Sequence, residues 1–200
     1  DRLLLAQLYQ KQAQTALDAS EAATLRASAK QQLQTMAAAS EANSLQLAAL
    51  VEFLLNNKLP DEAAIWLNNL ETKMQSESRD DPTLIAVYLA LRLRHGSYDR
   101  CPEWLDRLAV ADPEGLRPLA LRSQWLTAAG RSTEIEALVE AGAKKVLKNV
   151  ADLRQKAAIT RAVGDIYSNA NMQSSAERWY RSALQLDSAQ FGDRKSTRLN

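Results

Sequence analysis

A pattern of small and large apolar residues recurs four times along this chain of 200 residues. It is clearest in the segment AVGDIYSNANMQSSAERWYRSALQLD, residues 162–187, which reads as two short helices folded against each other. In the second helix of each copy, three residues spaced four and three apart share one helical face. The four sets are Ala63/Leu67/Leu70, Cys101/Leu105/Leu108, Ile135/Val139/Gly142 and Ala176/Tyr180/Ala183, at offsets of 38, 34 and 41 residues. This recurrence predicts stacked helical hairpins rather than one unique domain.

Two further features recur at the same register. Trp66, Trp104 and Trp179 occupy one position of the second helices, where we expect them to pack between helices. The turns carry residues that tolerate a left-handed backbone, namely Gly96, Gly130 and Asn171. Glycine and proline are scarce, at 6 and 5 residues, and good helix formers abound. The chain is therefore predicted to be all-α.

The best-formed copy resembles the tetratricopeptide (TPR) repeat. It carries Val163-Gly164, Tyr167, Ala176, Tyr180 and Ala183, where that family has L-G-x-x-Y and then A-x-x-x-F followed by a small residue. It departs from the family at Thr160, where a Trp is usual, and at Ser188, where a Pro is usual. The chain is similar to bacterial TPR proteins. The resemblance implies a right-handed superhelical α-solenoid of stacked helix-turn-helix repeats.

The proposed boundaries follow this register. We expect TPR-like repeats over 44–190, with units at 44–77, 82–115, 116–149 and 157–190. The first helix of the second unit is irregular, since Leu89 and Arg92 stand where a small residue and a Tyr are expected. Asp81-Pro82 and Asp112-Pro113 mark boundaries, because the residue before a proline leaves the helical region. Residues 1–43 are predicted to be an N-terminal helical region, either a partial or a divergent repeat.

The last residues are excluded from this repeat reading. Residues 193–200, DRKSTRLN, match the translation of a sequencing adapter, so we interpret them as non-native and expect a disordered tail over 191–200. Without the three basic residues and one acidic residue of 193–200, the net charge is −1 instead of +1. No basic excess of the kind typical of nucleic-acid binding remains.

The resemblance also indicates where a partner would bind. In TPR-like arrays the first helices line a concave groove that holds an extended peptide or a partner helix. The polar residues expected to face this groove are Glu52, Asn56, Arg94, Arg117, Gln124, Arg161, Asp165 and Asn169. Each of them could equally be a solvated surface position. The Lys/Asn set with which some TPR domains clamp acidic chaperone tails is missing at the corresponding positions.

No catalytic, cofactor or metal site is predicted. His95 and Cys101 are the only His and Cys, and neither has partners at ligand or catalytic spacing. We expect His95 at a helix C-terminus and Cys101 as a buried small residue. Ser132 or Thr133 is expected to cap a helix. Glu136 and Glu140 are interpreted as complementing the helix dipole on a solvated face.

These features favour a non-enzymatic protein-interaction scaffold that binds a peptide or helix of another protein. The first alternative is a regulatory TPR segment of a larger kinase or protease whose catalytic domain lies outside this fragment. The second is a helical-repeat RNA binder, against which the charge argues. We expect no nucleic-acid partner and no direct insertion into a membrane, and the oligomeric state stays open. A cytoplasmic location is the default expectation, since an N-terminal segment with a signal or anchor would lie outside this sequence.

Overall fold

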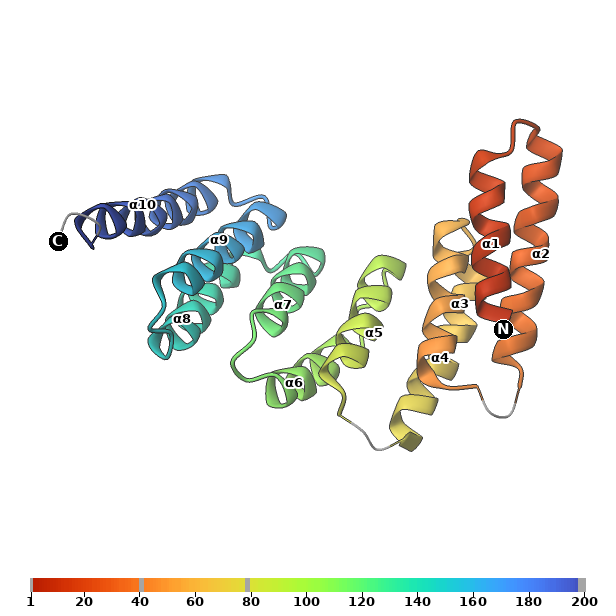
Figure 1. The fold of residues 1–200 in the computed structure, drawn as a ribbon. Helices are drawn as coiled ribbons and strands as arrows, with labels where there is room; N and C mark the ends of the chain where they lie inside the picture. Colours follow the sequence, from red (N-terminus) through yellow and green to blue (C-terminus); the bar gives the residue numbers. More distant parts are fainter. Residues whose placement is uncertain (1, 40–41, 78–79, 198–200) are drawn as a thin grey trace. The chain divides into compact units, whose positions relative to one another are not determined.

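The computed structural model describes residues 2–39, 42–77 and 80–197, with side chains to residue 188 (Figure 1). These ranges hold ten α-helices, one short 3-10 helix and no strand, which confirms the all-α prediction. The α-helices are α1 (Arg2–Thr15), α2 (Ala19–Ala37), α3 (Ser44–Asn56), α4 (Pro60–Glu77), α5 (Pro82–His95), α6 (Cys101–Ala111), α7 (Arg117–Ala128), α8 (Ile135–Lys148), α9 (Leu153–Asn169) and α10 (Gln173–Thr197).

The chain divides into two compact units, Asp1–Ser97 and Tyr98–Asn200. In the first unit α1 pairs with α2 and α3 with α4, and α5 packs against both α3 and α4. In the second unit α7 pairs with α8 and α9 with α10, and α9 packs against both α7 and α8. In both units a first helix thus lies on both helices of the preceding hairpin. This is the packing of a helical-repeat solenoid, as the sequence predicted.

The turns after the first helices share one backbone feature. Lys58, Gly96, Gly130 and Asn171 all have positive φ, at 60°, 88°, 72° and 59°. They recur at the 38-, 34- and 41-residue offsets of the apolar pattern. The predicted left-handed turns at Gly96, Gly130 and Asn171 are therefore confirmed. A left-handed residue ends a helix by letting the next N–H groups bond to its last carbonyls, as Ser97 N does to Arg92 O at 3.1 Å.

Side-chain caps begin several helices. Asp81 caps α5 and Asp152 caps α9, while Asn43 and Gln46 form a capping box at the start of α3. The predicted Ser132 or Thr133 cap is wrong. Both residues lie in the 3-10 helix Ser132–Glu134, and Glu134 precedes α8 without a side-chain cap. Arg131 binds the Glu134 carboxylate at 2.6 Å and lowers its pKa, so an ion pair organises this turn instead.

The repeated apolar positions form the core of each unit. Ala63, Leu67 and Leu70 of α4 are at most 1% exposed, and the three equivalent residues of α6 are equally buried. Ile135 and Val139 of α8 are also fully buried. The second unit's core includes Val163 and Tyr167 of α9 and Ala176 of α10. The recurring pattern is thus the set of residues through which neighbouring helices pack.

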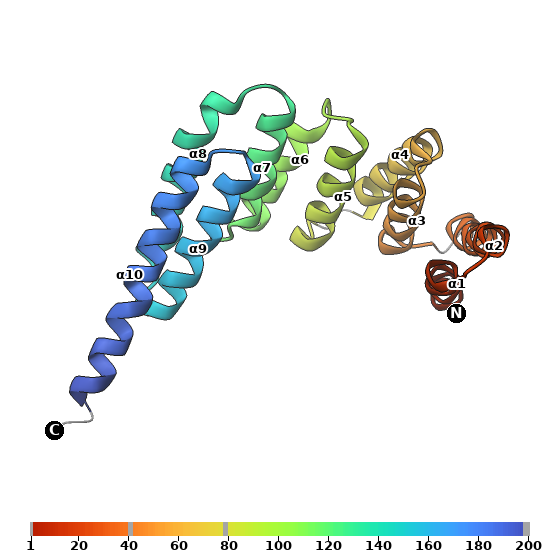
Figure 2. The same ribbon diagram turned by 90° about the horizontal axis from the view of Figure 1, so that it is seen from above.

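The C-terminal helix is longer than the sequence predicted. Residues 191–200 were expected to be disordered, but α10 continues to Thr197 and runs beyond the N-terminal end of α9 (Figure 2). The physical reason is that the run from Asp187 to Thr197 contains no proline, and Gly192 alone costs a helix only about 1 kcal/mol. Residues 198–200 lie outside the described ones.

Candidate functional site

The first helices of the first unit each expose one stripe of side chains. The stripe positions are spaced four, three and four residues apart, so they share one helical face. They are Leu3, Gln7, Gln10 and Gln14 on α1, Leu45, Ala49, Glu52 and Asn56 on α3, and Thr83, Val87, Ala90 and Arg94 on α5, all exposed or half-buried. The shift from α3 to α5 is the 38 residues of the core pattern. The repeat register therefore governs the surface as well as the core.

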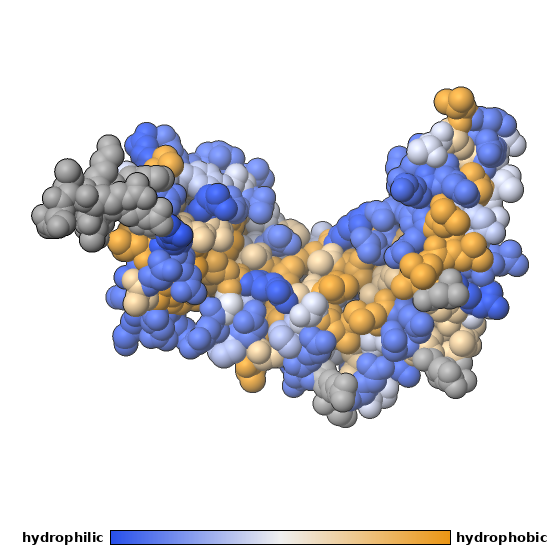
Figure 3. Space-filling model, viewed as in Figure 1, coloured by the Kyte–Doolittle hydropathy of each residue, from blue (hydrophilic) through white to orange (hydrophobic). Residues whose placement is uncertain are grey.

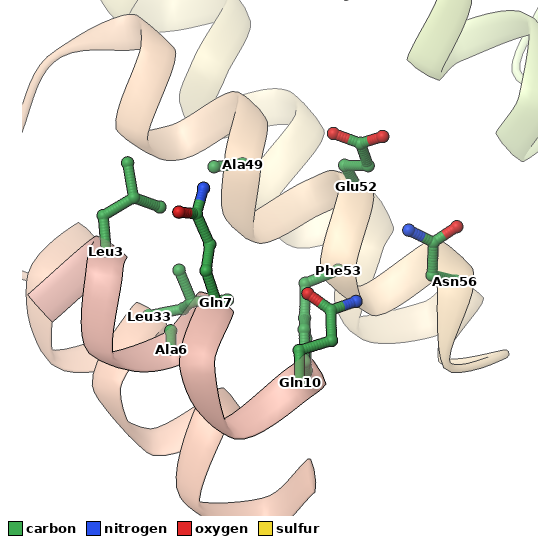
Figure 4. Close-up of a pocket in the computed structure, with 9 residues that line it drawn as sticks. All are labelled: Leu3, Ala6, Gln7, Gln10, Leu33, Ala49, Glu52, Phe53 and Asn56. Carbon is green, nitrogen blue, oxygen red and sulfur yellow. The ribbon is translucent and has the colours of Figure 1, made fainter. Parts of the chain in front are cut away.

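A hollow of about 190 Å³ lies between α1, α2 and α3 (Figure 4). Its floor is apolar and is made by the buried side chains of Ala6, Leu33 and Phe53. Its rim is polar. Gln7 of α1 points into the space between α1 and α3, and Glu52 lies above it on α3. The remaining lining residues are Leu3, Gln10, Ala49 and Asn56.

A hydrogen bond links the stripes of α3 and α5. Arg94 Nη2 donates to Asn56 Oδ1, which joins the last turns of two successive first helices. Glu52 lies one helical turn before Asn56 on the same face. The stripes therefore carry amides on α1, a carboxylate and an amide on α3, and a guanidinium on α5. Amides both donate and accept hydrogen bonds, so such a surface can pair with the backbone of an extended chain.

A buried ion pair fixes α5 on α4 beneath this surface. Arg92 Nη2 lies 2.6 Å from Glu71 Oε2, and both side chains are less than a tenth exposed. Arg92 Nε also donates to the Tyr88 hydroxyl at 2.7 Å, and Nη2 reaches Asn68 at 3.5 Å. Burial raises the pKa of Tyr88 above its usual range. Burial alone would lower the pKa of Arg92, but the hydrogen bond to Tyr88 and the charge of Glu71 outweigh it and raise that pKa.

This pair explains the irregular second unit of the sequence. Arg92 stands at the register of Tyr167 in α9, and Tyr167 likewise reaches the preceding second helix, since its hydroxyl donates to Glu140 at 3.3 Å. The same position therefore makes the same kind of contact with a different side chain. The sequence indicated that Arg92 was unusual but gave no sign that Glu71 faces it.

The second unit carries the other predicted groove residues. Arg117 and Gln124 lie exposed on α7, and Arg161, Asp165 and Asn169 lie exposed on α9. Arg117, Gln124, Asp165 and Asn169 stand at the stripe register, whereas Arg161 lies beside it. Asp165 accepts a hydrogen bond from the Tyr180 hydroxyl at 2.8 Å, which raises the pKa of that tyrosine.

The structure brings together three of the eight predicted residues in the first unit, namely Glu52, Asn56 and Arg94. Gln7 and Gln10 were missed because residues 1–43 were not aligned with the repeat. The sequence contained a signal for these two residues, because the four-three-four spacing of the α1 stripe recurs 42 residues later in the α3 stripe. Apolar surface also covers part of α1 (Figure 3), whose exposed leucines are Leu4, Leu5 and Leu8.

The remaining residues singled out by sequence have structural contacts. Cys101 and Trp104 are fully buried, as predicted. His95 ends α5, with Nδ1 2.5 Å from Ser97 Oγ and Nε2 3.0 Å from Pro60 O. Trp66 and Trp179 are half-buried.

The interpretation of Glu140 as a residue on a purely solvated face is wrong. Its carboxylate accepts hydrogen bonds from Arg178 at 2.6 Å and from the Trp179 indole at 3.1 Å. Arg178 also lies 3.4 Å from Glu136. These contacts join α8 to α10, the second helices of two successive hairpins, and no local sequence rule indicates them.

In the described part of the chain, no group of three or more His, Cys, Asp or Glu residues is placed to hold a metal ion. No helix within the same residues is both long and apolar enough to cross a membrane.

Comparison with known proteins identifies no family. No family model matches the chain, and no curated protein matches it. One solved structure, titled "MamA MSR-1 C2", is similar along most of its length, covering 94% of this chain and 98% of that chain at 15% identity and a TM-score of 0.49. The description of this chain as a helical-repeat protein rests on its own helix pairing and register.

Proposed function

We propose that this chain is a protein-interaction scaffold whose first-helix stripes bind an extended peptide or a helix of another protein. The observation that carries the proposal is the shared register of the exposed stripes on α1, α3 and α5, with Arg94 and Asn56 joined across two of them. A repeated surface of this kind offers similar contacts at regular intervals, which suits a partner that is itself a linear segment.

The proposed contact residues are the eight polar positions of the first helices, together with Gln7 and Gln10. In the first unit the hollow beside Glu52 has an apolar floor and a polar rim, so it suits an apolar side chain of the ligand. The amides around it suit the ligand backbone. In the second unit, Arg117 and Arg161 suit carboxylates, because a guanidinium can bind both carboxylate oxygens.

Selection of a displayed peptide library on the full chain tests the proposal. Peptides recovered in this way should bind Asn56→Ala more weakly than the unchanged chain, by about tenfold when one or two hydrogen bonds are lost. Asn69→Ala is the matched control, because Asn69 is an exposed asparagine on the second helix α4. Equal weakening by both variants, or by neither, would contradict binding at the first-helix stripes.

A further inference from the structure

One corner of the second unit, where α8 ends and α9 begins, concentrates positive charge. Its basic side chains, which we call the basic corner, are Lys144, Lys145, Lys148, Arg154 and Lys156. Asp152 is the single acidic residue between Lys144 and Lys156, and its side chain is already engaged in capping α9 through the N–H of Arg154 at 2.8 Å. The chain as a whole has a net charge of only +1, so this corner is a local concentration.

Helix stability explains only part of this cluster. Lys145 and Lys148 lie in the last turn of α8, where the helix dipole favours cations. Arg154 and Lys156 lie in the first turn of α9, where the same dipole disfavours cations and where no acidic residue is present. The side chain of Lys156 has no partner among the described residues to offset this unfavourable position, which indicates a contribution other than local stability.

The lysines of the basic corner also have no acidic partner in the described part of the chain. Lys144, Lys145, Lys148 and Lys156 make no side-chain hydrogen bond or ion pair there. Four arginines of this unit, in contrast, are paired with carboxylates, namely Arg122, Arg131, Arg178 and Arg181. The positive charge of these four lysines is therefore left for a molecule outside the unit.

A hollow of about 370 Å³ lies at this corner and is lined by one of these lysines, Lys145. Half-buried apolar side chains line it, and they belong to Leu116, Val146, Val150 and Ile159. Lys145, Asn149, Gln155 and Glu114 complete the lining. Residues 150–156, which lengthen the repeat spacing from 34 to 41, supply Val150 and Gln155. The insertion thus helps to form an apolar hollow next to unpaired positive charge.

We propose that this corner is a second docking site, which binds an acidic peptide segment through its carboxylates while one apolar side chain of the segment fills the hollow. Charge complementarity selects the acidic segment, and the four apolar residues select the anchoring side chain. Glu114 is the one acid of the hollow, so the ligand carboxylates lie on the Lys145 side. This site is separate from the first-helix stripes and does not depend on them.

Fluorescence anisotropy with three short synthetic peptides tests the site on the full chain. The first peptide contains only Asp and Glu around one central Leu, the second has Ala in place of Leu, and the third has Lys in place of the acids. The first should bind best, and the second should bind about tenfold more weakly because burial of a leucine side chain contributes about 1.5–3 kcal/mol. The third should not bind.

Charge-removing variants locate the site. Lys144→Gln/Lys145→Gln/Lys148→Gln should weaken binding of the leucine peptide by at least about tenfold and reduce its salt dependence. The control is Lys11→Gln/Arg26→Gln, which removes two exposed positive charges from α1 and α2 and should leave binding unchanged. Unchanged melting of the triple variant would show that it is folded.

Three outcomes would overturn the proposal. They are equal binding of the leucine and alanine peptides, equal loss in the control variant, and binding of single-stranded RNA or phosphatidylserine vesicles to these lysines with no binding of the acidic peptide. None of them bears on the stripes, which Asn56→Ala tests separately.

Discussion

The ring of Tyr180 lies directly against Gly164, so close that a Cβ at position 164 would fall 2.6 Å from Cε1 and 2.7 Å from Cδ1 of the tyrosine. Gly164 is on α9 and Tyr180 on α10, so this contact sets how closely the two helices of the last hairpin approach. The Tyr180 hydroxyl donates to Asp165 at 2.8 Å, which holds the ring in place. At these two positions the repeat pattern therefore corresponds to a small residue on one helix packed against a large residue on the other.

Gly164→Leu should destabilise the chain by about 2–3 kcal/mol, because the added side chain meets the Tyr180 ring and forces the helices apart. Urea unfolding followed by circular dichroism measures the change. Ala158→Leu on the exposed face of α9 is the control and should stay within about 0.5 kcal/mol. In a Tyr180→Ala background the cost of Gly164→Leu should shrink, and an undiminished cost would mean that the ring is not the obstacle.

Glu71→Leu should destabilise by about 3–5 kcal/mol, because it leaves the buried Arg92 guanidinium without its carboxylate. Glu71→Leu/Arg92→Met should recover most of that loss, since a buried ion pair is often replaceable by apolar residues of similar volume. Chemical denaturation of the single variants and the double variant gives the coupling energy. Additive effects would contradict the pairing of these residues.

Stability should fall as the pH rises above about 10. Burial raises the pKa of the Tyr167 hydroxyl, as it does that of Tyr88. At a pH below the pKa of these tyrosines in the unfolded chain, their hydroxyls are protonated in both the folded and the unfolded state. Their contribution to the free energy of unfolding is then fully present. Above that pKa the unfolded state loses its proton first, so the free energy of unfolding decreases until the folded-state pKa is passed.

Tyr167→Phe should flatten this alkaline decrease, because it removes one of the tyrosines whose pKa is raised in the folded chain. It disturbs the neighbours less than Tyr88→Phe, which would also take an acceptor from Arg92. Urea titrations between about pH 9 and pH 11 measure the slope. The same slope in Tyr167→Phe as in the unchanged chain would speak against this origin.

Glu140→Ala should destabilise by about 1–2 kcal/mol, because it removes the acceptor shared by Arg178, Trp179 and Tyr167. Glu177→Ala is the matched control, since Glu177 makes only an exposed pair with Arg181 within one helix and should cost about 0.5 kcal/mol or less. Thermal melting followed by tryptophan fluorescence reports both. Similar effects of the two substitutions would show that Glu140 does not join α8 to α10.

The spacing of apolar residues was sufficient to predict the helices and the turns between them. Ala63, Cys101, Ile135 and Ala176 are all buried, and the left-handed residues recur at the same offsets. These features depend on a helical face or on the φ of a single residue, which the local sequence encodes. The candidate stripes of α3 and α5 follow from the same register, whereas that of α1 was missed because its turn into α2 lacks a left-handed residue.

The sequence by itself determined the all-α class, the hairpins, and which residues of α3 and α5 face away from the core. Only the tertiary structure decided which side chains of neighbouring helices contact one another. Glu71 with Arg92, Glu140 with Arg178, and the hollow beside Lys145 all join residues at least 21 positions apart or on different helices. Such contacts depend on how one hairpin stacks on the next, and no local pattern of side chains specifies that distance or angle.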